Sequence, residues 1–395
     1  MSRAASSEQD YLLGGRKLGP GLVLFSVFAT WFGAETCIGA SGEVFAKGLS
    51  GASVDPFGYA ICVVLMGLLF AAPLWRMGLV TLADLFRRRY GEGVEWLATL
   101  IMIPTSLLWA AAQVRAFGQI VAAPTDIGTT MAISIAAAVV IVYTTAGGLM
   151  ADAVSDLLQG LVLIAGLVLI GCLVMQGGGW EALRHAEPMT LTAPGSGWLA
   201  TLETWSVPVL GSLVAQELVS RVIAARNAAV ARNSTIAAGV LYLAVGLIPV
   251  SLGLAAAHLL PADSEPEQVM ALLAGHYLPI WAYVVFIGAL VSAILSTVDT
   301  TLLACGSLTA HNLILPLRPE TSERGRLMAN RMAVVVYGIL AYLIALSGES
   351  VFALVQEASS LGSAGILVIL VFGLYTQGFG GRIAAYAALI CGLIV

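Results

Sequence analysis

The sequence predicts an all-α membrane protein with about eleven transmembrane helices. Of its 395 residues, 59% are hydrophobic and only 10% are charged, whereas soluble domains carry about 25% charged residues. Apolar stretches of about 20 residues, the length that crosses a bilayer as a helix, recur along the whole chain. The period-two alternation of a transmembrane β-barrel is absent. The chain is therefore expected in the cell inner (plasma) membrane as a multi-pass protein within a lipid bilayer.

Polar connections divide the chain into ten complete spans and an eleventh that is cut short at the chain end. They include the Arg87-Arg88-Arg89 run, the three glycines at 177–179 and the segment from Pro261 to Pro266. The expected spans are 21–45, 54–76, 92–122, 127–146, 152–176, 198–223, 233–259, 280–312, 328–347, 351–375 and 382–395.

Composition and motifs exclude several function classes. The net charge of −5 does not suit nucleic-acid binding, and the polar first 20 residues do not form a secretory signal peptide. There is no Walker loop and no metal-ligand cluster, and the four histidines are scattered, so we do not expect an enzyme. The five cysteines lie in apolar segments and are expected to be buried hydrophobic residues.

The distribution of basic residues predicts the orientation of the spans, because cytoplasmic connections are enriched in Lys and Arg. One set of connections, expected to be cytoplasmic, carries fourteen basic residues: Arg16, Lys17, Arg76, Arg87, Arg88, Arg89, Arg221, Arg226, Arg232, Arg318, Arg324, Arg326, Arg331 and Arg382. The opposite set holds only Lys47 and Arg184, while Arg3 lies in the tail and Arg115 within a span. The acidic 258–278 connection belongs to the opposite set and is expected to be external.

Ten helices can divide into two groups of five, and an odd number in each group inverts the second relative to the first. The first helix of each group has an interruption in mid-membrane: glycines at 33, 39 and 42, and Pro208 with Gly211. Such breaks can expose backbone carbonyls to ions, although glycines also permit close helix packing. The expected divisions are a cytoplasmic segment 1–20, a first repeat 21–176, an external connection 177–197, a second repeat 198–375 and a truncated additional helix 376–395.

The eighth span contains the largest group of polar residues. Ala293, Ser296 and Thr297 are spaced i, i+3 and i+4, so they share one helical face. Two hydroxyls with nearby carbonyls form an uncharged oxygen cage that suits a hard monovalent cation, although such hydroxyls also bond back to their own helix. Asp299 and Thr300 follow, and an aspartate inside an apolar helix is a functional candidate.

A second acidic residue opens the fifth span. Gly147 and Gly148 are expected to form a cytoplasmic turn, after which Asp156 and Gln159 share a helical face. Asp156 is either an ordinary first-turn carboxylate favoured by the helix dipole or part of an ion site.

Five segments together resemble the sodium:solute symporter family, which has the leucine-transporter fold. They are YLLGGR at 11–16, ATWFGAETCIGASG at 29–42, YTTAGGLMADAVSDLLQ at 143–159, QELVSRVIAAR at 216–226 and ALVSAILSTVDTTLLACGS at 289–307. ATW, VTLADLF at 80–86, WAAA at 109–112 and STVD at 296–299 are most similar to the choline transporter branch. Most members have an extra helix before the first of these segments, so the chain is expected to be a fragment or a shortened version.

The resemblance implies a leucine-transporter-type 5+5 inverted repeat and a sodium ion bound between the broken first helix and the eighth. Carried over residue by residue, the ligands are the carbonyls of Ala34, Cys37 and Ala293 and the hydroxyls of Ser296 and Thr297. Some members have a second sodium site, which here would use Asp156, Ser296, Asp299 and Thr300. Asp299 stands where serine is common.

The candidate substrate-binding residues are polar or aromatic and lie in mid-membrane: Trp31, Glu35, Trp109, Gln113, Arg115 and Gln216. Arg115 is expected either to pair with Glu35 or Glu357, or to hold a substrate carboxylate with Gln113. Trp31 and Trp109 could instead stack on a quaternary ammonium, although Ala215 stands where choline transporters are expected to have another tryptophan.

These observations favour a sodium-coupled symporter that imports a small organic solute, such as an amino acid, a carboxylate or a choline-like molecule. The rival hypothesis is a symporter-like sensor module of a signalling protein, which a kinase encoded after Val395 would favour. A channel is a weaker alternative, because broken helices favour an occluded site over an open pore. Sodium and the solute are the expected partners, and the oligomeric state stays open.

Overall fold

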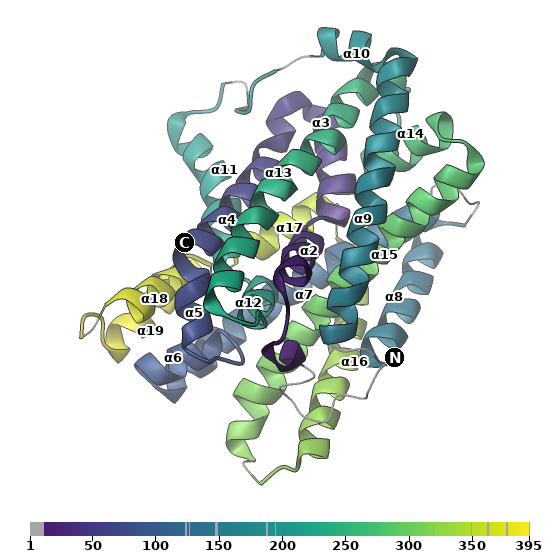
Figure 1. The fold of residues 1–395 in the computed structure, drawn as a ribbon. Helices are drawn as coiled ribbons and strands as arrows, with labels where there is room; N and C mark the ends of the chain where they lie inside the picture. The colour runs from purple at the N-terminus through teal and green to yellow at the C-terminus, as the bar shows by residue number, and fades with distance from the viewer. Residues whose placement is uncertain are drawn as a thin grey trace.

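The computed structural model describes residues 12–394, apart from residues 123–124, 126, 147–148, 187–188, 194, 319, 349, 362 and 377. The described residues form helices and their connections, with no strand longer than an isolated bridge between Leu18 and Ala225. Figure 1 shows long helices gathered into one bundle, with α10 at one end and α6 at the other. The expected turn at Gly147 and Gly148 lies outside the described residues.

The first five spans form in the expected order. The first consists of α2 (Pro20–Trp31), the π-helical segment η2 (Glu35–Ala40) and α3 (Ser41–Lys47). The second runs through η4 (Ser53–Gly58), α4 (Tyr59–Leu65), η5 (Met66–Phe70) and α5 (Ala71–Arg76). They are followed by the short α6 (Ala83–Tyr90), then by α7 (Glu92–Ala122), α8 (Thr129–Ala146) and α9 (Leu149–Val174).

The remaining spans follow a short helix, α10 (Trp180–His185). They are α11 (Trp198–Leu210) with η7 (Gly211–Val214) and α12 (Gln216–Ile223), then α13 (Ala228–Leu259), α15 (Ile280–Ser307), α16 (Glu323–Ser347), α17 (Val351–Ser360), α18 (Ser363–Tyr375) and α19 (Arg382–Ile394). The η8 turn (Pro266–Gln268) and α14 (Val269–Tyr277) lie between α13 and α15, and η9 (Leu308–Ile314) with η10 (Leu315–Leu317) extends α15.

Within the described residues, six helices are each long and apolar enough to cross a membrane, and two bent pairs bring the number to eight. Three shorter apolar helices accompany them: Pro20–Trp31, Thr129–Thr145 and Arg382–Ile394. One of the six is the 42-residue run Glu35–Arg76. At 1.5 Å per residue this run is about twice the thickness of a bilayer core, so it accommodates parts of two spans.

The two breaks lie close to the expected positions but not at them. α2 ends at Trp31, and Phe32 leaves the helical region with φ −93° and ψ 91°. The chain is helical again at Ala34, so the break precedes the expected 34–37. The second break is at Ala215, after the expected 207–211, and bends the two helices by 49°. Pro208 lies inside α11, because a proline can bend a helix without ending it.

The helices around the first break come from both halves of the chain. α2 packs against α9, α13 and α15, and α7 packs against α8, α15, α16 and α17. The expected single span 351–375 is divided into α17 and α18. The bundle therefore brings the end of α2 next to the polar face of α15.

Candidate functional site

The break after α2 exposes backbone carbonyls inside the bundle. The last four carbonyls of a helix lack the usual backbone partner one turn further along. At the end of α2, the Phe28 carbonyl accepts from the Phe32 N–H at 2.8 Å, whereas the Ala29 and Trp31 carbonyls are met by side-chain hydroxyls from other helices. Gly33 occupies the break: a Cβ added there would lie 3.5 Å from Thr297 Oγ1. The end of α2 and the middle of α15 are therefore in direct contact.

Thr297 bridges these two helices through its hydroxyl. Its Oγ1 lies 3.1 Å from the Ala29 carbonyl oxygen of α2 and 3.2 Å from the Ala293 carbonyl oxygen of α15. Both carbonyls and the hydroxyl are buried oxygens. Three oxygens of the kind that the sodium hypothesis requires are thus already together.

The expected ligands Ala34 and Cys37 lie five and eight residues after Ala29 in the chain. The Cys37 carbonyl already accepts a hydrogen bond from Ser41 Oγ at 2.6 Å, and Ala34 has helical dihedral angles. The Ala29 carbonyl was missed, since a sequence shows glycines but not the residue at which the helix ends. The position of Trp31-Phe32 before Gly33 was the only available signal.

Ser296 contacts Asp156 of α9. The Asp156 carboxylate accepts hydrogen bonds from Ser296 and, at 2.8 Å, from Ser26 of α2. Asp299 accepts from Thr144 of α8. All these side chains are buried. The residues expected at the second sodium site therefore do gather around the contact of α2, α8, α9 and α15.

Arg221 is the residue in this cluster that sequence reasoning assigned wrongly. It was counted among the cytoplasmic cations, but its side chain is 0% exposed. Its guanidinium lies 3.6 Å from Asp156 Oδ2 and 3.3 Å from Thr30 Oγ1, and it donates to Thr300. A buried charge needs a partner of opposite sign, and Asp156 supplies it. The orientation stays a prediction, which rests on the other cations of that set.

Three aromatic rings form a buried cluster beside the break. The ring centroids are 4.7 Å apart for Trp31 and Trp109, 5.0 Å for Trp31 and Tyr59, and 5.9 Å for Tyr59 and Trp109. We call Trp31, Tyr59 and Trp109 the aromatic cluster. Tyr59 was not identified from the sequence, because its position on α4 gives no sign that it faces the other two rings. The rings touch, so a solute could enter only if they separate.

Glu35 and Gln113 add polar groups to the aromatic cluster. Gln113 Nε2 donates to Glu35 Oε1 at 2.6 Å, and Trp109 lies within hydrogen-bonding reach of the same carboxyl group. Glu35 Oε2, Gln113 Oε1 and Trp31 Nε1 are buried and have no hydrogen-bond partner among the described residues. Because buried polar atoms are nearly always paired, three such atoms at one place indicate a binding site.

Arg115 and Gln216 lie in other surroundings. Arg115 pairs with Glu267 at 3.3 Å, a carboxylate other than the Glu35 or Glu357 named from the sequence. Gln119 also donates to Glu267, at 2.7 Å, so η8 is held against α7. Gln216 accepts from the Leu82 backbone N–H at 2.8 Å. Neither side chain is joined to the aromatic cluster by these bonds, since each is engaged at a loop.

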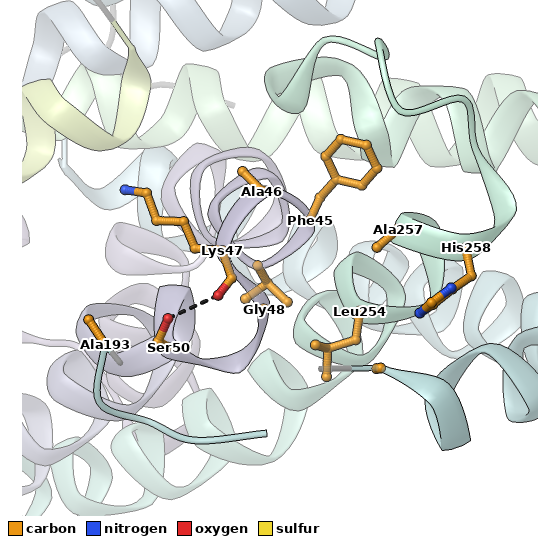
Figure 2. Close-up of a pocket in the computed structure, with 11 residues that line it drawn as sticks. Phe45, Ala46, Lys47, Gly48, Ser50, Ala193, Leu254, Ala257 and His258 are labelled. Atoms are coloured by element: carbon orange, nitrogen blue, oxygen red, sulfur yellow. Dashed lines mark hydrogen bonds between the residues drawn. The ribbon is translucent and has the colours of Figure 1, made fainter. Parts of the chain in front are cut away.

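A cavity of about 420 Å³ lies elsewhere, near the end of α3 (Figure 2). Figure 2 shows the Ser50 hydroxyl donating to the Lys47 carbonyl beside it, and Phe45 and Leu254 on its wall. The Lys47 ammonium pairs with Glu43 at 2.6 Å. The lining of the cavity is mainly apolar, and none of the candidate site residues belongs to it.

Comparison with known proteins identifies the family. The family model described as "Sodium:solute symporter family" matches residues 11–394. The high-affinity choline transporter 1 of Caenorhabditis elegans is 26% identical over 89% of this chain and 65% of that protein. The human high affinity choline transporter 1 is 26% identical over 98% and 70%, and the Staphylococcus aureus sodium/proline symporter is 23% identical over 100% and 80%.

Solved structures share the fold. A Na+-coupled sialic acid symporter in a substrate-bound outward-open state superimposes with a TM-score of 0.78 at 16% identity, covering 99% of this chain and 92% of that one. MHP1, a nucleobase-cation-symport-1 family transporter, gives 0.65 at 15% identity, covering 100% and 93%. The chain spans less than two thirds of the length of the Caenorhabditis and Drosophila choline transporters.

Proposed function

Because the chain belongs to the sodium:solute symporter family, we propose that it is a sodium-coupled symporter that imports a small organic cation by alternating access. The observation that carries the choice of a cation is the buried Glu35 carboxyl group beside the aromatic cluster, which a bound cation would hold in its ionised form. Transport without covalent chemistry would need no catalytic residue.

The chemistry of the aromatic cluster favours a positive charge. The faces of Trp and Tyr rings attract ammonium groups, more strongly when water is excluded. The unpaired oxygen of Glu35 can accept a charge-assisted hydrogen bond or balance a quaternary ammonium. Arg115 is engaged with Glu267, which weakens the alternative of a substrate carboxylate.

The choline transporter relatives support a quaternary or protonated amine. Trp31 and Trp109 are the two tryptophans that the sequence shares with that branch, and the third position holds Ala215. Here Tyr59 of α4 supplies the third ring, in contact with Trp31 and Trp109. Because Ala215 is smaller than the tryptophan expected at this position in choline transporters, the preferred solute is expected to be bulkier than choline.

We further propose that sodium binds where α2 and α15 meet. Thr297 Oγ1 and the carbonyls of Ala29 and Ala293 would contribute ligands, with Ser296 turning from Asp156 to join them. This arrangement replaces Ala34 and Cys37 of the sequence hypothesis with the carbonyl that the break exposes. Uncharged and anionic oxygens suit a hard cation.

Charge balance in the adjoining cluster favours a single sodium ion. Asp156 and Asp299 contribute two negative charges and Arg221 one positive charge within the same buried region. One monovalent cation would make the region neutral, while a second would leave a net positive charge in low dielectric. Arg221 would thus take the place of a second sodium ion beside Asp156.

Uptake into proteoliposomes tests the function. With an inward sodium gradient, we expect choline and bulkier quaternary amines to accumulate, and proline and lactate not to do so. Replacing external sodium by potassium should abolish accumulation. Uptake of proline or lactate in preference to every amine would refute the proposal that the solute is a cation. Accumulation that does not depend on sodium would refute the proposed coupling to sodium.

A further inference from the structure

A ring of three buried polar side chains lies next to the break in the first span. Asp55 Oδ2 is 2.9 Å from Thr36 Oγ1, Thr36 Oγ1 is 2.7 Å from the Tyr242 hydroxyl, and that hydroxyl is 2.9 Å from Asp55 Oδ1. The three residues come from η4, η2 and α13 and are at most 1% exposed. The ring therefore joins three elements of the bundle in its interior.

The number of hydrogens determines the charge of this ring. All three contacts have the length of O–H···O hydrogen bonds, and each needs one hydrogen. Thr36 and Tyr242 supply one hydrogen each. With Asp55 ionised, one of the three close oxygen pairs has no hydrogen between its atoms and is repulsive. With Asp55 protonated, its hydroxyl donates to Thr36, Thr36 donates to Tyr242, and Tyr242 donates to the second carboxyl oxygen.

Among the residues that the structure describes, no positively charged group lies near enough to Asp55 to stabilise its ionised form. The titratable groups in electrostatic reach are Glu35, Cys37, Tyr59 and Tyr242. α11 also packs against η4, and its Glu203 is exposed. In the described part of the chain, Asp55 forms no ion pair with Lys, Arg or His. An isolated carboxylate at this depth would be costly.

The ring is also connected to the aromatic cluster. The Tyr242 hydroxyl lies 3.3 Å from the carbonyl oxygen of Trp31, the last residue of α2. Thr36 follows Glu35 directly in the chain. Loss of the proton from Asp55 would therefore disturb both sides of the break that positions Trp31 and Glu35.

We propose that Asp55 is a proton-binding site that couples a proton to solute binding and transport, in addition to sodium. The coupling of this proton to solute transport rests on the proposed function. Asp55 is protonated when the ring is closed, as here, and releases the proton to water when the first span moves away from α13. Closure around the solute then takes up a proton from the aqueous side that is open.

Infrared spectroscopy of the purified protein tests the proton site without any solute. We expect the wild type to show, at neutral pH, a protonated-carboxyl band that is missing in Asp55→Asn and that disappears at alkaline pH. Glu43→Gln, a matched change at an acid partnered by Lys47, should retain the band. A difference spectrum showing an ionised Asp55 carboxylate throughout the neutral range would overturn the proposal.

Calorimetry tests the coupling, with choline as the probe. Choline binding measured in buffers of different ionisation enthalpy should show uptake of about one proton by the wild type above the Asp55 transition. Asp55→Asn, which keeps a donor in the ring, should bind choline with no proton uptake. Zero proton uptake by the wild type across the pH range would refute coupling even if the variant failed to fold.

The two arms separate the two proposals. If choline binding does not depend on sodium, the proposed symport of a cation fails, while the infrared result still decides whether Asp55 holds a proton. If binding depends on sodium but neither the infrared band nor the proton uptake is found, only the proton inference fails.

Discussion

The Thr297 hydroxyl lies 3.1 Å from the Ala29 carbonyl oxygen and so joins the middle of α15 to the last turn of α2. The two residues are 268 positions apart in the chain. Their contact places a side-chain oxygen against a carbonyl that the end of the helix leaves without an intrahelical partner. The first prediction follows from it.

Replacing Thr297 by alanine should weaken sodium binding. The change removes one proposed oxygen ligand and keeps the helix, because alanine is a good helix former. We expect the sodium concentration for half-maximal choline binding to rise roughly tenfold, equivalent to about 1.4 kcal/mol. Reciprocal linkage requires the loss of choline affinity to be largest at low sodium and small at saturation. Superimposable sodium curves for the two proteins would remove Thr297 from the site. Thr309→Ala, further along the same span and bonded to Tyr337 instead, is the matched control.

The Arg221 guanidinium should limit the protein to one sodium ion per cycle. We expect wild-type uptake to depend on sodium concentration with a Hill coefficient of about one, since a second cation beside Asp156 would be repelled. Arg221→Gln removes the positive charge and should either abolish folding or raise the coefficient above one. A wild-type flux ratio of two sodium ions per solute, measured by dual isotope uptake, would contradict the charge balance.

Neutralising Glu35 should reduce solute affinity and leave sodium affinity almost unchanged. Glu35→Gln keeps the size of the side chain but removes the negative charge beside the aromatic cluster, so we expect a loss of tenfold or more in amine affinity, about 1.4 kcal/mol or more. Glu357→Gln, on an exposed acid of α17, is the matched control and should behave as wild type. Equal amine affinity in the Glu35 and Glu357 variants would exclude Glu35 from the solute site.

Asp84 should make the stability of the protein around α6 depend on pH. Burial raises the pKa of this carboxyl group, but the His311 ring and the Val80 and Thr81 N–H groups outweigh burial, and the net effect lowers the pKa. A carboxyl group whose pKa is lower in the folded state stabilises the fold above its unfolded pKa of about 3.9. That contribution is lost as the pH falls through the folded-state pKa.

The difference in melting temperature between wild type and Asp84→Asn measures this effect in detergent. We expect wild type to be the more stable protein at neutral pH, and the gap to shrink steadily in acid below the unfolded pKa. A gap that stays constant from neutral to acid pH would show that the Asp84 charge makes no contribution.

The sequence alone was sufficient for the membrane class, the order of the spans and the family, because these depend on composition, on the length of apolar runs and on local motifs. It also identified the polar face of α15, since residues at i, i+3 and i+4 share a face in any helix. Trp31, Glu35, Trp109 and Gln113 were selected from the sequence by their depth in their spans, and the fold places Trp31 against Trp109 and Gln113 against Glu35. These properties are local and do not require knowing which helices touch.

Only the tertiary structure determined which oxygens and charges meet. The end of α2 at Trp31 depends on packing against α13 and α15, so the sequence could not show that Ala29, rather than Ala34 or Cys37, presents a carbonyl to Thr297. Arg221 lies near the end of its span like a cytoplasmic cation, and only the fold buries it beside Asp156. Asp55, Thr36 and Tyr242 come from three elements, and their ring exists because those elements pack together. Contacts between distant segments are set by the packing of whole helices, which no local pattern encodes.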